Sequence, residues 1–190
     1  MTSVARRAGR SDSLACAGDS RRGTELEAET IATERLLLTP LRSGDADELV
    51  EVLADPRLHQ FIGGRPATPD ELRARYAAMT AGSSNPDELW RNWVVRLLAG
   101  AQPVGTVQAT LYRRQAGWGA DVAWVVGVPH QGQGYAAEAA SALVAWLADR
   151  DVGEVVAHIH PDHAASAGVA RRAGLRPTGE LVDGEVVWRR

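Results

Sequence analysis

The hydrophobic pattern of the chain is strongest between Asp121 and Asp149. A near-continuous apolar run, Val122–Val128, predicts a buried strand, and Pro129 ends it because proline has no N–H to donate to a sheet. The glycine-rich segment Gln131–Ala136 then leads directly into an alanine-rich helix. Apolar residues recur on one face of this helix at Ala136, Ala139, Ala140, Leu143, Val144 and Leu147. This spacing predicts a helix that packs against a sheet.

Two helix starts precede the central strand. The run Arg35–Leu41 predicts a first strand, with Pro40 near its end. Asp45 and Glu48 have the spacing of a capping box, which predicts a first helix. The segment Thr68–Glu71 predicts a second helix, because it places a threonine cap, a proline and a glutamate in the order that favours a helix N-terminus.

The remaining pattern completes a single α/β domain. Apolar runs bounded by turn residues predict further strands, and a short helix is expected between two of them, capped by Asp162. The further strands are Trp93–Leu98, Val104–Tyr112, Glu154–His160, Leu175–Val182 and Glu185–Trp188, and the short helix is Ala164–Ala173. The predicted order is therefore β, α, α, β, β, β, α, β, α, β, β, in one domain over residues 31–190.

Residues 1–30 have the composition of a tail that lacks a core. The segment is rich in Arg, Ser, Gly, Glu and Ala, so little of it can be buried and we expect it to be disordered. The single cysteine, Cys16, fits a reducing, cytoplasmic location. The formal charge of −3 gives no general case for binding nucleic acid, and no apolar run is long enough to cross a membrane.

The segment between the central strand and its helix has the features of an anion site. The backbone N–H groups at a helix N-terminus point at one spot, and the aligned peptide dipoles make that spot electropositive. A pyrophosphate would therefore fit beside Gln131–Ala136. The alternative is an ordinary strand-to-helix turn. The segment is not a P-loop, since no Gly-Lys-Ser/Thr follows, and it is not a GxGxxG motif.

Three stretches of the chain resemble one known family. The form Gln131-x-x-Gly134-x-Ala136 after an apolar strand resembles the acetyl-CoA motif of the GNAT N-acetyltransferases, commonly Arg/Gln-x-x-Gly-x-Gly/Ala. The sequences TERLLLTPLRSGDADEL and HPDHAASAGVARRAGLRPTGEL resemble motifs of the RimJ/RimL-type branch, which acetylates ribosomal proteins. The resemblance extends from Thr33 to Arg190 and includes the predicted element order.

The resemblance implies a fold and an activity. The GNAT fold has a central mixed, mostly antiparallel sheet that is splayed between its fourth and fifth strands and flanked by helices. Its members transfer the acetyl group of acetyl-CoA to a primary amine, here of a protein N-terminus or a small molecule, by direct attack in a ternary complex. The alternative is a catalytically weak CoA-binding sensor or partner module. No nucleic acid or membrane partner is expected, and a homodimer stays open.

The resemblance also implies which residues bind the cofactor. The N–H groups of the glycine-rich segment would hold the pyrophosphate, and the pantetheine arm would lie along the end of the central strand, where a backbone N–H faces the thioester oxygen. Two residues of the second motif would lie near the CoA sulfur. The full set is Val126, Gly127, Val128, Gln131, Gly132, Gln133, Gly134, Tyr135, Ala136, His163 and Ser166.

Two residues are candidates for catalysis. Ser166 occupies the family's serine position, where its hydroxyl can reach the CoA sulfur; the alternative is a surface serine. Other branches carry a tyrosine four residues later, but here that residue is Ala170, and His163 replaces the usual asparagine. Asp121 stands where relatives often carry a glutamate, so it is the candidate base, acting directly or through water; the alternative is a solvated carboxylate.

Histidine and tryptophan residues suggest two weaker hypotheses. His158, His160 and His163 with Asp162 could bind zinc, but no Cys or Glu completes the set, so we favour structural histidines and no metal site. Six tryptophans are expected to be mostly in the core. Three of them lie near predicted loop-to-strand junctions and could wall an acceptor cleft: Trp90, Trp93 and Trp118.

Overall fold

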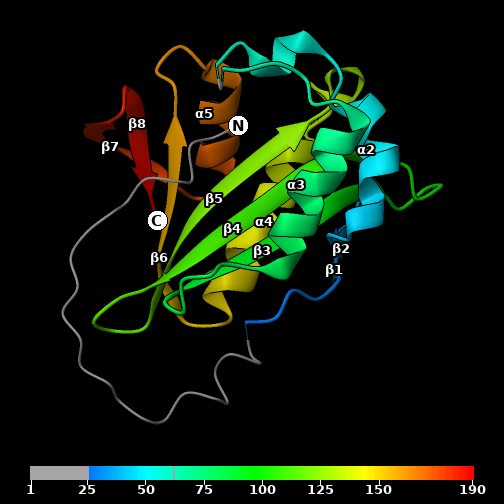
Figure 1. Ribbon diagram of the computed structural model, residues 1–190. Helices are drawn as coiled ribbons and strands as arrows, with labels where there is room; N and C mark the ends of the chain where they lie inside the picture. Colours follow the sequence, from blue (N-terminus) through cyan, green and yellow to red (C-terminus); the bar gives the residue numbers. More distant parts are fainter. Residues whose placement is uncertain (1–25, 62) are drawn as a thin grey trace.

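The centre of the fold is an eight-stranded sheet in the order β1-β2-β3-β4-β5-β6-β8-β7. A computed structural model, which describes residues 26–61 and 63–190, shows this sheet crossing the whole molecule (Figure 1). Neighbouring strands are antiparallel except β5 and β6, which are parallel. The strands are β1 (Ile31–Ala32), β2 (Leu36–Pro40), β3 (Glu88–Leu97), β4 (Pro103–Arg113), β5 (Trp118–Val126), β6 (Val152–Ile159), β7 (Arg176–Val182) and β8 (Glu185–Arg189).

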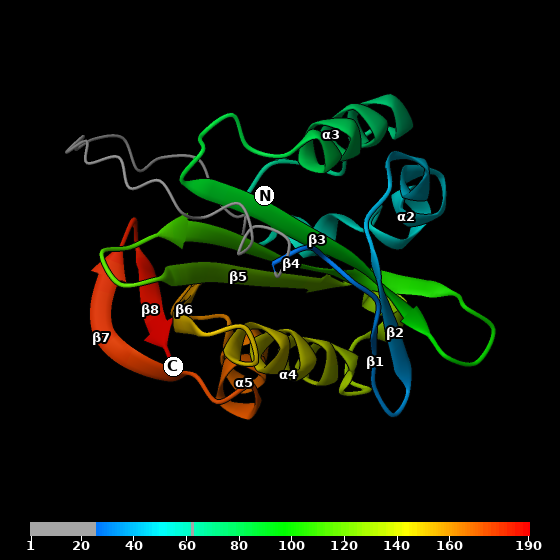
Figure 2. The same ribbon diagram turned by 90° about the horizontal axis from the view of Figure 1, so that it is seen from below.

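Helices cover both faces of the sheet, as the view from below shows (Figure 2). On one face lie α2 (Ala46–Val52) and α3 (Pro69–Ala81), and on the other lie α4 (Tyr135–Ala148) and α5 (Ala164–Arg172). Three short 3-10 turns connect the elements: η1 (Ser43–Asp45), η2 (Pro56–His59) and η3 (Val128–His130). The predicted α/β class, the mostly antiparallel sheet and the order of elements are confirmed, with β1 as an additional short strand.

The strands β5 and β6 are joined along only part of their length. Their register pairs run from Trp118↔Val152 to Asp121↔Val156. Beyond these pairs β5 continues to Val126 and β6 to Ile159. The GNAT-type splay between these strands, the fourth and fifth of the prediction, stays a prediction.

The helix α4 buries its predicted stripe against the sheet. Ala139, Ala140, Leu143, Val144 and Leu147 are all buried in the main core, which also takes in residues of β3, β4, β5 and β6. At the start of the helix Ala137 is buried, whereas Ala136 of the predicted stripe is only partly buried. A second, smaller core lies under α2 and α3 on the opposite face. The sheet is therefore buried on both sides, which fits the near-continuous apolar run of β5.

One of the two predicted capping boxes forms. The N–H of Glu71 donates to Thr68 Oγ1 (3.3 Å), and the N–H of Thr68 donates to Glu71 Oε2 (2.8 Å). The box predicted for Asp45 and Glu48 is wrong. Asp45 lies in η1 and accepts instead from the N–H of Arg42 (2.7 Å), while Glu48 pairs with Arg96 (2.8 Å).

The described chain begins inside the segment predicted as a tail. Residues 1–25 of that tail lie outside the described residues. Leu26 is 3% exposed and belongs to the main core. Arg91 Nε donates to the Leu26 carbonyl (2.5 Å), and Trp93 Nε1 donates to the Glu29 carbonyl (2.8 Å). The domain therefore includes Leu26 and Glu29. No described helix has the length and apolar character needed to span a membrane.

Leu26→Ala should destabilise the fold. The side chain is almost fully buried, so its truncation leaves a cavity and should lower the free energy of unfolding by about 2–5 kcal/mol, measured by urea denaturation. Leu98→Ala is the matched control, because Leu98 is 51% exposed and its truncation should cost less than about 0.5 kcal/mol. Equal effects of the two substitutions would show that Leu26 does not dock on the domain.

Candidate active site

The segment between η3 and α4 forms an open cradle at a helix N-terminus. Gly132 (φ 76°) and Gly134 (φ 85°) both have left-handed backbones, which glycine adopts without a steric penalty. Gly134 is the N-cap of α4, and no described side chain caps this end of the helix. A Cβ added at Gly132 would meet no heavy atom within 4 Å. The cradle therefore has the exposed N–H groups and the free space that a phosphate-bearing ligand requires.

A charged network from the turn between β1 and β2 supports this cradle. Thr33 Oγ1 donates to Glu138 Oε1 (2.6 Å), and Arg35 Nε donates to Glu138 Oε2 (2.7 Å). Arg35 Nη1 also donates to the Gln133 carbonyl (3.0 Å), so the guanidinium lies against the glycine segment. Burial disfavours the charged form of Glu138, but the bonds from Thr33 and Arg35 outweigh it and lower its pKa. Neither Arg35 nor Glu138 is predicted as a site residue from the sequence, because their pairing joins positions 103 residues apart.

The last residues of β5 differ in which way their backbones point. The N–H of Gly127 donates to the Val104 carbonyl (2.9 Å), so this N–H is not available to a ligand. Because antiparallel partners alternate, Trp124 and Val126 point their N–H groups the other way, toward the β6 side. The Val126 carbonyl accepts from Gln131 Nε2 (2.9 Å), and Val128 already lies in η3. Among the residues predicted to contact the pantetheine arm, Val126 has a backbone N–H that could bond the arm as a neighbouring strand would.

Two cavities meet at β5. The first, of about 60 Å³, lies between β5 and β6 directly past their last register pair, and we call it the β5–β6 cavity. It is lined by Phe61, Val122, Ala123, Trp124, Ala157, His158, Ile159, His160, His163, Ser166 and Glu185. The second, of about 360 Å³, lies between α2, α3 and strands β3 to β5, and we call it the α3 cavity.

The α3 cavity is larger and mostly apolar. It is lined by Val50, Leu53, Leu58, His59, Ala67, Leu72, Arg75, Tyr76, Met79, Trp90, Asn92, Thr106, Gln108, Thr110, Ala123, Trp124 and Val125. Ala123 and Trp124 line both cavities. A group bound in one cavity is therefore separated from a group in the other by two neighbouring residues of β5.

Ser166 and His163 lie together at the start of α5, as predicted. Trp124 Nε1 donates to Ser166 Oγ (3.0 Å), which fixes the hydroxyl at the β5–β6 cavity. The sequence predicted Asp162 as the N-cap of this helix, but the N-cap is His163. Its Nδ1 accepts from the N–H of Ser166 (3.5 Å). The ring stacks on Phe61, with centroids 4.3 Å apart. His163 thus takes over a capping role that an asparagine side chain could also fill.

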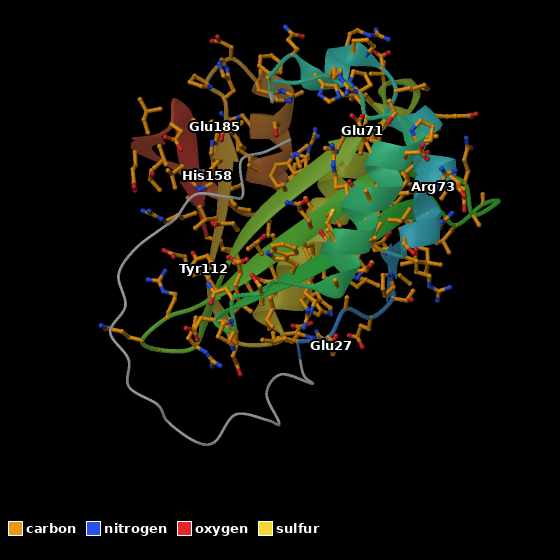
Figure 3. All side chains as sticks on the ribbon, in the orientation of Figure 1. Glu27, Glu71, Arg73, Tyr112, His158 and Glu185 are labelled. Carbon is orange, nitrogen blue, oxygen red and sulfur yellow. The ribbon has the colours of Figure 1, made fainter. Side chains whose placement is uncertain are left out.

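The candidate base Asp121 lies on the same sheet face as α3. Its register partner Thr110 and its near neighbour Ala123 line the α3 cavity, but Asp121 itself lines neither cavity. His158 Nε2 lies 3.9 Å from Asp121 Oδ1. His158 lines the β5–β6 cavity and extends from the front of β6 in Figure 3. The imidazole therefore connects the carboxylate to the cavity that holds Ser166.

Two weaker hypotheses from the sequence concern a zinc site and an acceptor cleft walled by tryptophans. In the described part of the chain, no three His, Cys, Asp or Glu side chains are grouped closely enough to hold a metal ion. Trp90 lines the α3 cavity, as expected. Trp93 (0% exposed) and Trp118 (7%) are in the main core, so their predicted place in an acceptor cleft is wrong. Trp124, which joins both cavities, was missed because nothing in its local sequence distinguishes it from a core tryptophan.

The fold is that of acyltransferases that use coenzyme A thioesters. The chain belongs to the acetyltransferase (GNAT) domain family, whose model matches residues 35–176. It is an N-acetyltransferase that uses acetyl-CoA.

Known proteins agree with this assignment. The uncharacterized N-acetyltransferase p20 of Bacillus licheniformis is 23% identical over 158 residues, which cover 83% of this chain and 88% of p20. Ribosomal-protein-S5-alanine acetyltransferase from Vibrio fischeri matches with a TM-score of 0.71 at 17% identity, over 86% of this chain and 96% of that one. RimL, a ribosomal L7/L12 α-N-protein acetyltransferase in complex with coenzyme A, matches with a TM-score of 0.67 at 18% identity, over 85% and 97%. At these identities the solved structures show the fold.

Gly134→Glu should abolish the rise in melting temperature that acetyl-CoA causes. A Cβ at Gly134 would lie 3.3 Å from Arg35 Nη2, and the carboxylate would repel a pyrophosphate in the cradle. Gly179→Glu is the matched control, because Gly179 also has a positive φ (78°) but lies in β7. It should retain the full ligand-induced shift. A normal shift in folded Gly134→Glu would remove the cofactor from this cradle.

His163 should make stability depend on pH. Burial, and then the charge of His160, lower the pKa of His163 below its ordinary 6.5. As the pH falls through 6.5, the unfolded chain binds this proton before the folded chain does, so the free energy of unfolding decreases from 6.5 down to the folded pKa and is fully regained above 6.5. His163→Asn keeps a cap but cannot titrate, so its urea-unfolding profile should be flatter across this window. An unchanged profile would contradict the assignment.

Proposed function

We propose that this enzyme transfers the acetyl group of acetyl-CoA to a primary amine, on a protein N-terminus or a small molecule, by direct attack while both substrates are bound. The observation that carries the proposal is the pair of cavities that share Ala123 and Trp124. Ser166 lines the β5–β6 cavity, so this cavity receives the thioester end of acetyl-CoA. The larger α3 cavity then receives the acceptor, and the two reacting groups meet at β5.

Acetyl-CoA supplies the activated acetyl group, and the chain supplies its binding site. The cradle residues Gly132–Ala136 hold the pyrophosphate through backbone N–H groups, each worth about 1.5–3 kcal/mol as a charge-assisted hydrogen bond, whereas the N–H of Gln131 already donates to the Val128 carbonyl (3.2 Å). The N–H of Val126 points toward the β6 side of β5, where it can bond a pantetheine arm. His163 and Ser166 close the sulfur end.

Ser166 protonates the departing thiolate. A serine hydroxyl has one hydrogen to donate and two acceptor sites. Trp124 Nε1 occupies an acceptor site, so the Ser166 O–H remains available as a donor in the β5–β6 cavity. The position of the family's tyrosine is occupied here by Ala170, which is fully buried and carries no hydroxyl. Ser166 is therefore the hydroxyl donor that this site offers to the sulfur.

Asp121 acts as the base through His158. The amine must lose one proton as its nitrogen bonds to the acetyl carbon, and imidazole suits this role because it changes protonation near neutral pH. The Asp121 carboxylate lies 3.9 Å from His158 Nε2, so it can pair with the ring once the ring has taken the amine's proton. Two of the relatives act on ribosomal proteins by name, which supports a protein N-terminus as one acceptor. The alternative, a catalytically weak CoA-binding module, would bind acetyl-CoA without releasing free thiol.

Ser166→Ala should lower kcat by about 10²–10⁴ and leave the affinity for acetyl-CoA nearly unchanged, because it removes a general acid. The defect should persist at high pH, since raising the pH does not help a leaving group. Ser141→Ala on α4 is the control and should retain wild-type kcat. Free-thiol release over an amine panel measures all three proteins. Wild-type kcat in Ser166→Ala would leave water as the donor.

The pH dependence of activity in Asp121→Asn and His158→Gln should be opposite to that of Ser166→Ala. Both should lose activity mainly below the pKa of the acceptor amine and recover as the pH rises, because an amine that has already lost its proton needs no base. Asp70→Asn is the control for the charge change, since Asp70 is 94% exposed at the surface of α3. If both variants keep the wild-type pH profile, neither residue takes part in proton removal.

A further inference from the structure

Two unpaired amide side chains lie on the floor of the α3 cavity. Asn92 and Gln108 are direct register partners on β3 and β4, and both line the cavity. Within residues 26–61 and 63–190, neither side-chain amide makes a hydrogen bond to the protein. Each amide offers donors and an acceptor. A polar group that enters the cavity therefore meets a neutral surface that can both donate to it and accept from it.

The walls of the cavity are apolar and carry no negative charge. Leu53, Leu72, Met79 and Trp90 are among the side chains around the amide floor. Among the described lining residues there is no Asp or Glu, and the ionisable ones are the basic Arg75 and His59 together with Tyr76. A second cationic group on the acceptor would lose its water of hydration here without gaining a carboxylate partner.

We propose that the acceptor is an α-amino amide with a bulky uncharged side chain, as in the first residue of a peptide. Asn92 and Gln108 bond its amide group, and its side chain fills the apolar part of the α3 cavity, whose volume of about 360 Å³ is within the range of small-molecule sites. The inference rests on the proposed function, in which this cavity receives the amine. The proposed acceptor class excludes polyamines and peptides whose first residue is basic.

Three probes with the same α-amino amide group test the side chain. L-norleucinamide is bulky and neutral, L-argininamide is bulky and cationic, and L-alaninamide is small. The wild-type enzyme should show a kcat/KM for L-norleucinamide at least about tenfold above that for either of the others, because the neutral side chain is buried at no charge cost. A preference for L-argininamide or L-alaninamide would overturn the inference and leave the acetyltransferase activity intact.

Variants of the floor test the recognition of the amide. Asn92→Leu and Gln108→Leu should each lower kcat/KM for L-norleucinamide about tenfold, because each removes hydrogen bonds to the acceptor. Both should keep the rise in melting temperature with acetyl-CoA. Gln102→Leu, in the turn between β3 and β4, is the control and should match wild type. Wild-type kcat/KM in both floor variants would contradict the role of the amides.

A charge substitution gives the sharpest result. Gln108→Glu has nearly the same shape and places a carboxylate on the floor, so the ratio of kcat/KM for L-argininamide to that for L-norleucinamide should rise at least about tenfold over wild type. An unchanged ratio would place the side chain outside this cavity.

Binding separates failure of the inference from failure of the proposed function. Melting temperatures with coenzyme A and each probe report binding without turnover. If no probe is acetylated but L-norleucinamide alone stabilises the complex, the acceptor class stands and the proposed activity toward these amines fails. If no probe is acetylated and none binds, the acceptor class is wrong.

Discussion

The site depends on where the parallel pairing of β5 and β6 ends. The register pairs run to Asp121↔Val156, and the β5–β6 cavity begins with the next residues of both strands. An antiparallel neighbour, β4, pairs with β5 along its full length on the other edge, so β5 stays in the sheet while its β6-side groups beyond Asp121 are available for a ligand. Trp124, Ser166 and His158 meet there because the sheet stops pairing at this point.

A second constraint is the charge balance at the start of α4. The first turn of this helix contains Glu138, and a carboxylate so close to a phosphate site would repel the ligand. Thr33 and Arg35 bind that carboxylate, and Arg35 also bonds the Gln133 carbonyl. The guanidinium therefore compensates the local negative charge and ties the strand β2 region to the cradle. The N-terminal motif of the chain thus contributes to the proposed binding site and not only to the sheet.

The sequence predicted the elements that local patterns determine. The α4 stripe, the Thr68–Glu71 box and the placement of Ser166 at the start of α5 follow from spacing within a few residues. The contacts that complete the site join distant positions: Trp124 and Ser166 are 42 residues apart, and Arg35 and Glu138 are 103 apart. Such pairs depend on sheet register and strand order, which hydrophobic periodicity does not specify.

Other misses have local causes. Leu26 is a lone leucine in a polar segment, so no periodicity indicated its burial. Asp162 and His163 are adjacent, and the backbone of His163 (φ −86°, ψ 67°) decides which of them caps α5. Trp93, one of the three tryptophans predicted for the cleft, is turned into the core by strand alternation, because it follows Trp90 by an odd number of residues on β3.

Among the described residues, the linings of the two cavities have Ala123 and Trp124 in common, and this has an evolutionary consequence. The walls of the α3 cavity come mainly from α2, α3, β3 and β4, whereas β6 and α5 supply the opposite side of the β5–β6 cavity. Under the proposed assignment of the cavities, substitutions in α2 and α3 would therefore give duplicated genes new acceptors without changing the residues proposed to meet the acetyl donor. Ala123 and Trp124 would not vary as freely, since any change there alters both cavities at once.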